Sequence, residues 1–141
     1  MLSQSQLALA AGVEVLGGLM LSHGFVYAPL GAGTSSGGYF ASGEFRRGEH
    51  SLELHYRYSL GLVTYHVGKL ALTHEDYVWA IVGRRWTGAY PGFSSEPLDA
   101  FRHLLADLQR YGHDFLAGSE SDFAARIKQA EALKKAASRL P

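Results

Sequence analysis

Residues 52–81 read LELHYRYSLGLVTYHVGKLALTHEDYVWAI, and this stretch decides the fold class. Apolar and polar side chains alternate with a period of two over residues 52–58 and again over residues 62–67. Such alternation is typical of strands that bury one face and leave the other toward solvent. The polar positions of these two strands include Glu53, His55, Arg57 and His66. Short turns at residues 59–61 and 68–69 predict an antiparallel meander that continues into LALT.

Two further strands are predicted upstream, over residues 24–30 and 39–45, with a turn at residues 46–50 before the next strand. Between them, GAGTSSGG at residues 31–38 is rich in the residues of a phosphate-binding loop. A phosphate loop needs Lys-Ser/Thr after the glycines and a helix start directed at the anion, whereas YFASGEF follows here. We therefore predict a flexible hairpin loop.

The chain begins with a predicted helix. Ser3 and Gln6 have the spacing of a capping box, apolar residues recur at helical spacing, and His23-Gly24 predicts an end near Ser22. Three glycines lie within this helix: Gly12, Gly17 and Gly18. Each weakens it by about 1 kcal/mol relative to Ala, so the helix needs tertiary packing, and its glycines would let another element approach closely.

Three helices are predicted after the strands. Their start and stop signals are Thr73 and Gly83, Pro97 and Gly118, and Ser119 or Ser121 for the start of the last. The predicted fold class is α+β: an N-terminal helix, a four- to five-stranded antiparallel meander, and three C-terminal helices packed on the sheet. With 141 residues and no linker that divides it, the chain is expected to form a single domain over residues 1–141.

Composition narrows the function classes. Lys plus Arg and Asp plus Glu are both 13, so the chain has no basic excess of the kind that nucleic-acid binding requires. The absence of cysteine excludes disulfides and thiol chemistry and fits a reducing compartment. The apolar N-terminus lacks a basic n-region and contains Glu14, so we expect a core helix with no signal or membrane role, and a cytoplasmic protein.

The polar face of the meander is the first candidate site. If helices cover only the apolar face, Glu53, His55 and Arg57 lie beside His66 on an open surface. Imidazoles on adjacent strands could ligate a metal or exchange protons, which makes His55, His66 and Glu53 the alternative of a small metal-dependent or acid–base enzyme. No third ligand at recognisable spacing and no HExxH signature accompanies them, so we favour a solvated or partner-binding face and expect neither a metal nor another cofactor.

The segment GRRWTGAYPGF, at residues 83–93, is the second candidate. It contains residue types that dominate protein–protein hot spots: Arg84, Arg85, Trp86, Tyr90 and Phe93. An arginine pair beside aromatic rings would suit an acidic partner surface. The alternative is that the three aromatic rings fold back against the edge of the core.

Two polar clusters on the predicted helices have structural explanations. In THED, residues 73–76, Thr73 is expected to cap the helix, the acids to occupy its first turn, and His74 to be merely tolerated. His103 and Asp107 are four residues apart, and Arg110 follows three residues later. Such a set could bind a metal or orient a base, but we expect an exposed hydrogen-bonded row there.

The run from LELHYRYSLGLVTYHVG to HEDYVWAI, with YPGFSSEPLDAFRHLLADLQRYGHDFLAG, resembles small standalone bacterial α+β proteins of the immunity-protein-like kind, over residues 40–118. This resemblance implies a cytosolic binder that neutralises a toxin domain by covering its active site. It rests on the overall pattern of the sequence and assigns no role to any single residue.

The leading hypothesis is therefore a non-enzymatic immunity or inhibitor protein whose partner is a cognate bacterial toxin domain. The alternatives are the metal-dependent or acid–base enzyme described above and a small-molecule-binding domain, with a pocket between the aromatic sheet and the glycine-rich loop. A homodimer is also compatible with a tyrosine-rich sheet that has an uncovered edge.

Overall fold

The computed structural model describes residues 2–35, 38–83 and 96–138. Its elements, in chain order, are α1 (Gln4–Ser22), β1 (Val26–Ser35), β2 (Gly38–Arg47), β3 (His50–Arg57), β4 (Ser59–Val67), β5 (Leu70–Thr73), α2 (His74–Val82), α3 (Asp99–Tyr111), α4 (His113–Ala117) and α5 (Glu120–Ser138). All strand pairs are antiparallel and neighbours in sequence are neighbours in the sheet. The predicted α+β class with a meander is confirmed, with five strands.

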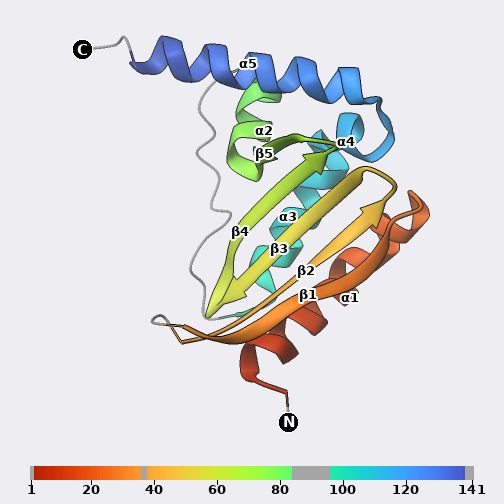
Figure 1. Ribbon diagram of the computed structural model, residues 1–141, viewed down its shortest axis with the longest axis vertical. Coiled ribbons are helices and arrows are strands. Elements are labelled where there is room, and N and C mark those ends of the chain that lie inside the picture. Colours follow the sequence, from red (N-terminus) through yellow and green to blue (C-terminus); the bar gives the residue numbers. More distant parts are fainter. Residues whose placement is uncertain (1, 36–37, 84–95, 139–141) are drawn as a thin grey trace.

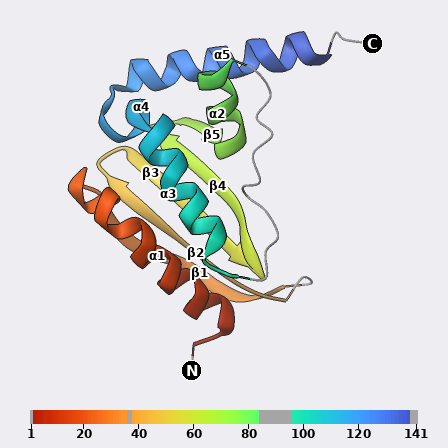
Figure 2. The ribbon, with the colours of Figure 1, turned by 180° about the vertical axis from the view of Figure 1, so that it is seen from behind.

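The helices leave one face of the sheet uncovered among the described residues. Seen from behind, α1 and α3 cross the sheet and contact each other (Figure 2). Seen from the front, strands β1 to β4 face the viewer with no helix over them, and α5 lies at the β5 end of the sheet against α2 (Figure 1). We call the uncovered side of the sheet the open face.

The core lies between the sheet and the helices α1, α3 and α4. Leu52, Leu54 and Tyr56 of β3 point into it, as their alternation predicts. Phe115 of α4 stacks on Phe25 with ring centroids 5.4 Å apart. It also meets the edge of Tyr65, on β4, at 4.8 Å. Burying side chains of this size provides most of the stabilisation of the layer.

Helix α1 forms as predicted, with the complete capping box of Ser3 and Gln6 and with His23 as its C-cap. Its buried stripe includes Leu9, Leu16 and Met20. By length and composition α1 could cross a membrane, but a core helix of a soluble protein passes the same test, and this stripe packs on the rest of the protein.

Three local predictions need correction. Residues 31–35 belong to strand β1 and pair with β2 after a bulge, so that part of the expected loop is strand. The turn between β3 and β4 lies at Tyr58, whose φ of 62° reverses the chain before Ser59. The helix expected from Pro97 begins at Asp99 and is divided at Gly112 into α3 and α4.

Candidate functional site

The open face collects the polar positions of three strands. Glu53, His55 and Arg57 are half-buried and alternate on β3 with core residues. His66 of β4 is half-buried on the same side, and Glu44 and Arg46 of β2 lie across from them. The structure therefore brings together Glu53, His55, Arg57 and His66 on one surface, as the period-two pattern predicts.

One end of the open face is rich in carboxylates. Glu53 Oε1 accepts a hydrogen bond of 2.9 Å from His66 Nε2. Glu44 accepts two hydrogen bonds from Arg46, from Nε at 2.9 Å and from Nη2 at 3.4 Å. The hydrogen bond to Glu44, then the charge of Glu44, and more weakly the charge of Glu49 raise the pKa of Arg46 above its usual value. This end of the open face therefore has three carboxylates, Glu44, Glu49 and Glu53, and one guanidinium, that of Arg46.

The other end of the open face combines a cation with stacked rings. The Arg57 guanidinium lies over the Phe40 ring, 5.9 Å from its centroid. Phe40 in turn stacks on His55, with centroids 5.4 Å apart and planes 20° apart. Leu62 pairs with His55 in the strand register and is 52% exposed. This end offers an apolar and cationic contact surface.

The strand register separates the two histidines of the metal hypothesis. His66 pairs with Ser51, which precedes His55 by four residues on β3. Four residues of strand span about 13 Å, too far for two imidazoles to share one ion. Within the described residues, no group of three His, Asp or Glu side chains could hold a metal. The register therefore gives the metal alternative no geometric support.

The second predicted site lies outside the described residues. Arg84, Arg85, Trp86, Tyr90 and Phe93 all fall within residues 84–95, so their expected role as a binding loop stays a prediction.

Sequence reasoning missed a buried polar network. Tyr65 Oη and His74 Nδ1 are 2.7 Å apart, and His74 Nε2 lies 2.9 Å from Asp107 Oδ2. Tyr65 is 0% exposed and His74 is 2% exposed. A carboxylate only accepts, so His74 Nε2 donates to Asp107, and in the neutral imidazole Nδ1 accepts from the Tyr65 hydroxyl. The network joins β4, α2 and α3.

This network corrects two expectations. Thr73 does cap α2, accepting from Asp76 N, but His74 is a central partner and not a tolerated residue. Asp107 turns inward from α3 and bonds to His74, whereas His103 and Arg110 of the expected row are exposed. The sequence could have indicated that His74 is buried, because it lies three and four residues before the apolar Tyr77 and Val78 and therefore on the same side of the helix. Since the phenol and the imidazole are closed off from solvent, the arrangement fits a structural bond between elements better than a catalytic one.

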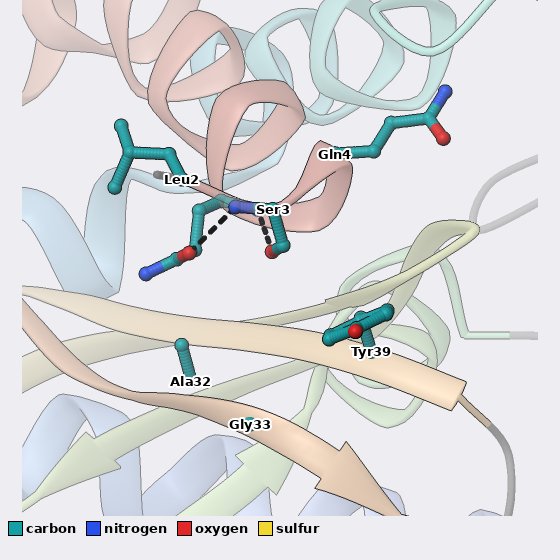
Figure 3. Close-up of a pocket in the computed structure, with 7 residues that line it drawn as sticks. Leu2, Ser3, Gln4, Ala32, Gly33 and Tyr39 are labelled. Atoms are coloured by element: carbon teal, nitrogen blue, oxygen red, sulfur yellow. Dashed lines mark hydrogen bonds between the residues drawn. The ribbon is translucent and has the colours of Figure 1, made fainter.

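A separate pocket of about 530 Å³ lies between the start of α1 and the β1–β2 hairpin (Figure 3). Leu2 and Tyr39 line it, with Ala32 and Gly33 of the glycine-rich segment, and none of its lining residues is charged. Ser5 Oγ donates to the Tyr39 carbonyl at 3.0 Å and ties the hairpin to the helix. The glycine-rich segment thus borders a pocket, but that pocket is open, and Tyr56, Tyr58 and Tyr65 are not among its lining residues.

No protein-family model matches this chain, and neither the curated proteins nor the solved structures gave a significant match. The assignment of a function rests on the geometry of the open face.

Proposed function

We propose that this chain is a non-enzymatic protein-binding module whose open face binds a partner protein, and that it acts in the cytoplasm as an immunity or inhibitor protein toward a bacterial toxin domain. One observation carries the proposal: a five-stranded sheet buries one side under helices, while its other side carries a carboxylate-rich end and a cationic, aromatic end. The resemblance to immunity-protein-like chains supports the choice of partner.

The chemistry of the open face favours a protein partner. Arg57 and its stacked rings are the residue types that contribute most to interface affinity. Opposite charges at the two ends would select a partner surface of the complementary pattern and fix its orientation, because like charges brought together cost several kcal/mol. An antiparallel sheet also presents its side chains on a rigid frame, which lowers the entropy lost on binding.

The pairing and the exposure of the acidic and basic side chains favour a binding function over a catalytic one. Glu44 and Glu53 on the open face pair with Arg46 and His66, and these pairs are partly exposed to solvent. In the buried Tyr65–His74–Asp107 network, Tyr65 is 0% exposed and His74 is 2% exposed, so these groups are closed off from a substrate in solution. The exposed pairs lie in contact with water and the buried network lies out of reach of a substrate, whereas a catalytic site needs a reactive group that a substrate can reach.

The test is a complex with toxin domains encoded beside this chain, measured by isothermal titration calorimetry. We expect Glu53→Lys and Arg57→Glu each to weaken binding by about 100-fold, which corresponds to about 2.7 kcal/mol. Lys128→Glu on α5, an exposed charge reversal away from the sheet, is the matched control and should change affinity less than threefold. Equal losses for all three variants, or no complex with any neighbouring toxin domain, would refute the proposal.

A further inference from the structure

The carboxylate-rich end of the open face contains a pocket of about 240 Å³. We call it the acidic pocket. Its lining residues are Glu44, Arg46, Glu49, Ser51, Glu53, His66 and Gly68. They come from β2, β3, β4 and the turns beside these strands, so the sheet itself fixes the positions of the pocket walls.

Charge in the acidic pocket is unbalanced. Three glutamates face one arginine, and Arg46 already donates to Glu44 and, from Nη1, to the Gly48 carbonyl at 3.2 Å. Glu53 uses Oε1 for His66. The Glu49 carbonyl accepts from Gly68 N, but the Glu49 carboxylate makes no ion pair or hydrogen bond with the part of the chain that the structure describes. The Glu49 carboxylate and the second oxygen of Glu53 therefore retain capacity to accept hydrogen bonds.

An independent observation concerns Ser51. Its side chain is buried, with 1% of the residue exposed, yet it lines the acidic pocket. Its hydroxyl has no hydrogen-bond partner among the described residues. Because Ser51 lines the pocket and its hydroxyl is not among the enclosed side-chain atoms without a partner, that hydroxyl can be reached by a hydrogen-bonding group in the pocket. On β3 it stands two residues before Glu53 and on the same side, so it directs a hydrogen-bonding group toward the same space as that carboxylate.

We propose that the acidic pocket receives the guanidinium group of an arginine on the partner protein, with Glu49, Glu53 and Ser51 accepting its hydrogen bonds. This inference rests on the proposed function, because it names the chemistry of the partner at that surface. A guanidinium has five donors in a planar fork and is weakly hydrated, so it suits several acceptors spread over one wall better than a compact ammonium does. Arg46 and Glu44 already form such a two-bond pair beside the pocket.

The direct test needs no partner. The probe is N-acetyl-L-arginine N-methylamide, titrated into the full chain labelled with ¹⁵N and followed by amide chemical shifts. We expect saturable shifts at Ser51, Glu53 and His66 with a Kd on the order of millimolar, as suits one side chain. The citrulline analogue has the same shape without the charge and should bind at least fivefold more weakly. The lysine analogue should fall between the two.

Substitutions of the pocket residues, each compared with a control variant, test whether the probe binds in the acidic pocket. The double variant Glu49→Gln and Glu53→Gln should lose about tenfold in probe affinity, because two charge-assisted acceptors become neutral. Ser51→Ala should lose about threefold. Glu14→Gln, an exposed carboxylate on α1, is the control and should leave probe affinity unchanged. Amide spectra of the free variants show whether each one keeps the fold.

The inference is overturned if no saturable shift occurs up to about 50 mM probe, if citrulline binds equally, or if the control loses as much as the double variant. This failure can be told apart from failure of the proposed function. If only the arginine pocket is wrong, Arg57→Glu still weakens the protein complex by about 100-fold, while the double variant leaves its affinity unchanged. If only the partner assignment is wrong, the probe still binds at Ser51.

Discussion

A single histidine joins three elements of this protein. His74 begins α2, receives the Tyr65 hydroxyl from β4 and donates to Asp107 of α3. Hydrogen bonds to charged groups contribute about 1.5–3 kcal/mol, and removing one partner of a buried network costs its desolvation as well. His74 is therefore one of the residues on which the relative positions of sheet and helices depend.

Replacing His74 by Phe should keep the ring and remove both hydrogen bonds. We expect the free energy of unfolding to fall by about 3 kcal/mol, because Tyr65 loses its acceptor and Asp107 its donor in a buried place. Urea unfolding measures it. The control His103→Ala removes an exposed imidazole from α3 and should cost less than about 0.5 kcal/mol. A cost for His74→Phe as small as that of the control would contradict the structural role.

His50 makes stability depend on pH. Burial, and then the charge of Arg47, lower the pKa of His50 below its usual 6.5, against the opposing hydrogen bond of Gly118 and the charge of Glu120. The unfolded chain therefore takes up the proton first as pH falls, and stability is lost progressively from pH 6.5 down toward the folded pKa.

His50→Gln should flatten this part of the stability profile, since glutamine does not titrate. The measurement is the free energy of unfolding from urea melts between about pH 7.5 and 5.5, above the range of most carboxylates. Wild type should lose more stability over this window than the variant. Parallel profiles for the two proteins would show that another group causes the loss.

At the scale of elements, the glycines of α1 have different structural roles. Gly12 faces α3, and a Cβ there would overlap the ring of Phe101, so this glycine permits close packing of the two helices. Gly17 and Gly18 have nothing within 4 Å of such a Cβ. The expectation that the glycines admit a close neighbour is thus confirmed for Gly12 alone.

Paired substitutions in α1 test this difference. Gly18→Ala should raise the free energy of unfolding by about 0.5–1 kcal/mol through helix propensity. Gly12→Ala gains the same propensity but must displace buried Phe101, and we expect a net loss of about 1–3 kcal/mol. Thermal or urea unfolding of both variants suffices, and equal effects of the same sign would contradict the packing of α1 on α3.

At the scale of the whole molecule, the sheet is a one-sided layer. Phe115 is fully buried on the helix side, where it contacts Phe25, Tyr65 and Phe123. Phe40 is half-buried on the open face beside His55 and Arg57. Phe115 and Phe40 have the same side chain. The difference between the losses of stability on removing each one therefore measures how differently the two sides of the sheet are packed.

Phe115→Ala should cost about 3–5 kcal/mol, because it leaves a cavity within the aromatic cluster. Phe40→Ala should cost less than about 1.5 kcal/mol, since water can replace the ring on the open face. Urea unfolding of both variants measures the two losses of stability. A cost at Phe40 equal to that at Phe115 would mean that the open face is covered.

Much of this protein follows from its sequence alone. Period-two alternation determined the strands and the side of the sheet on which Glu53, His55 and Arg57 lie, because each strand residue must point to one side or the other. The capping box at Ser3 and the cap at Thr73 determined where two helices begin, since these signals act over three or four residues.

Only the tertiary structure decided which of these groups meet. His66 bonds to Glu53 and not to His55 because the register between β3 and β4 sets the partners. Asp107 reaches His74 across 33 residues because α2 and α3 both contact β4. The acidic pocket likewise exists only once three strands bring Glu44, Ser51 and His66 side by side. Local patterns fix the direction of a side chain, whereas its partners depend on contacts between segments that are distant in sequence.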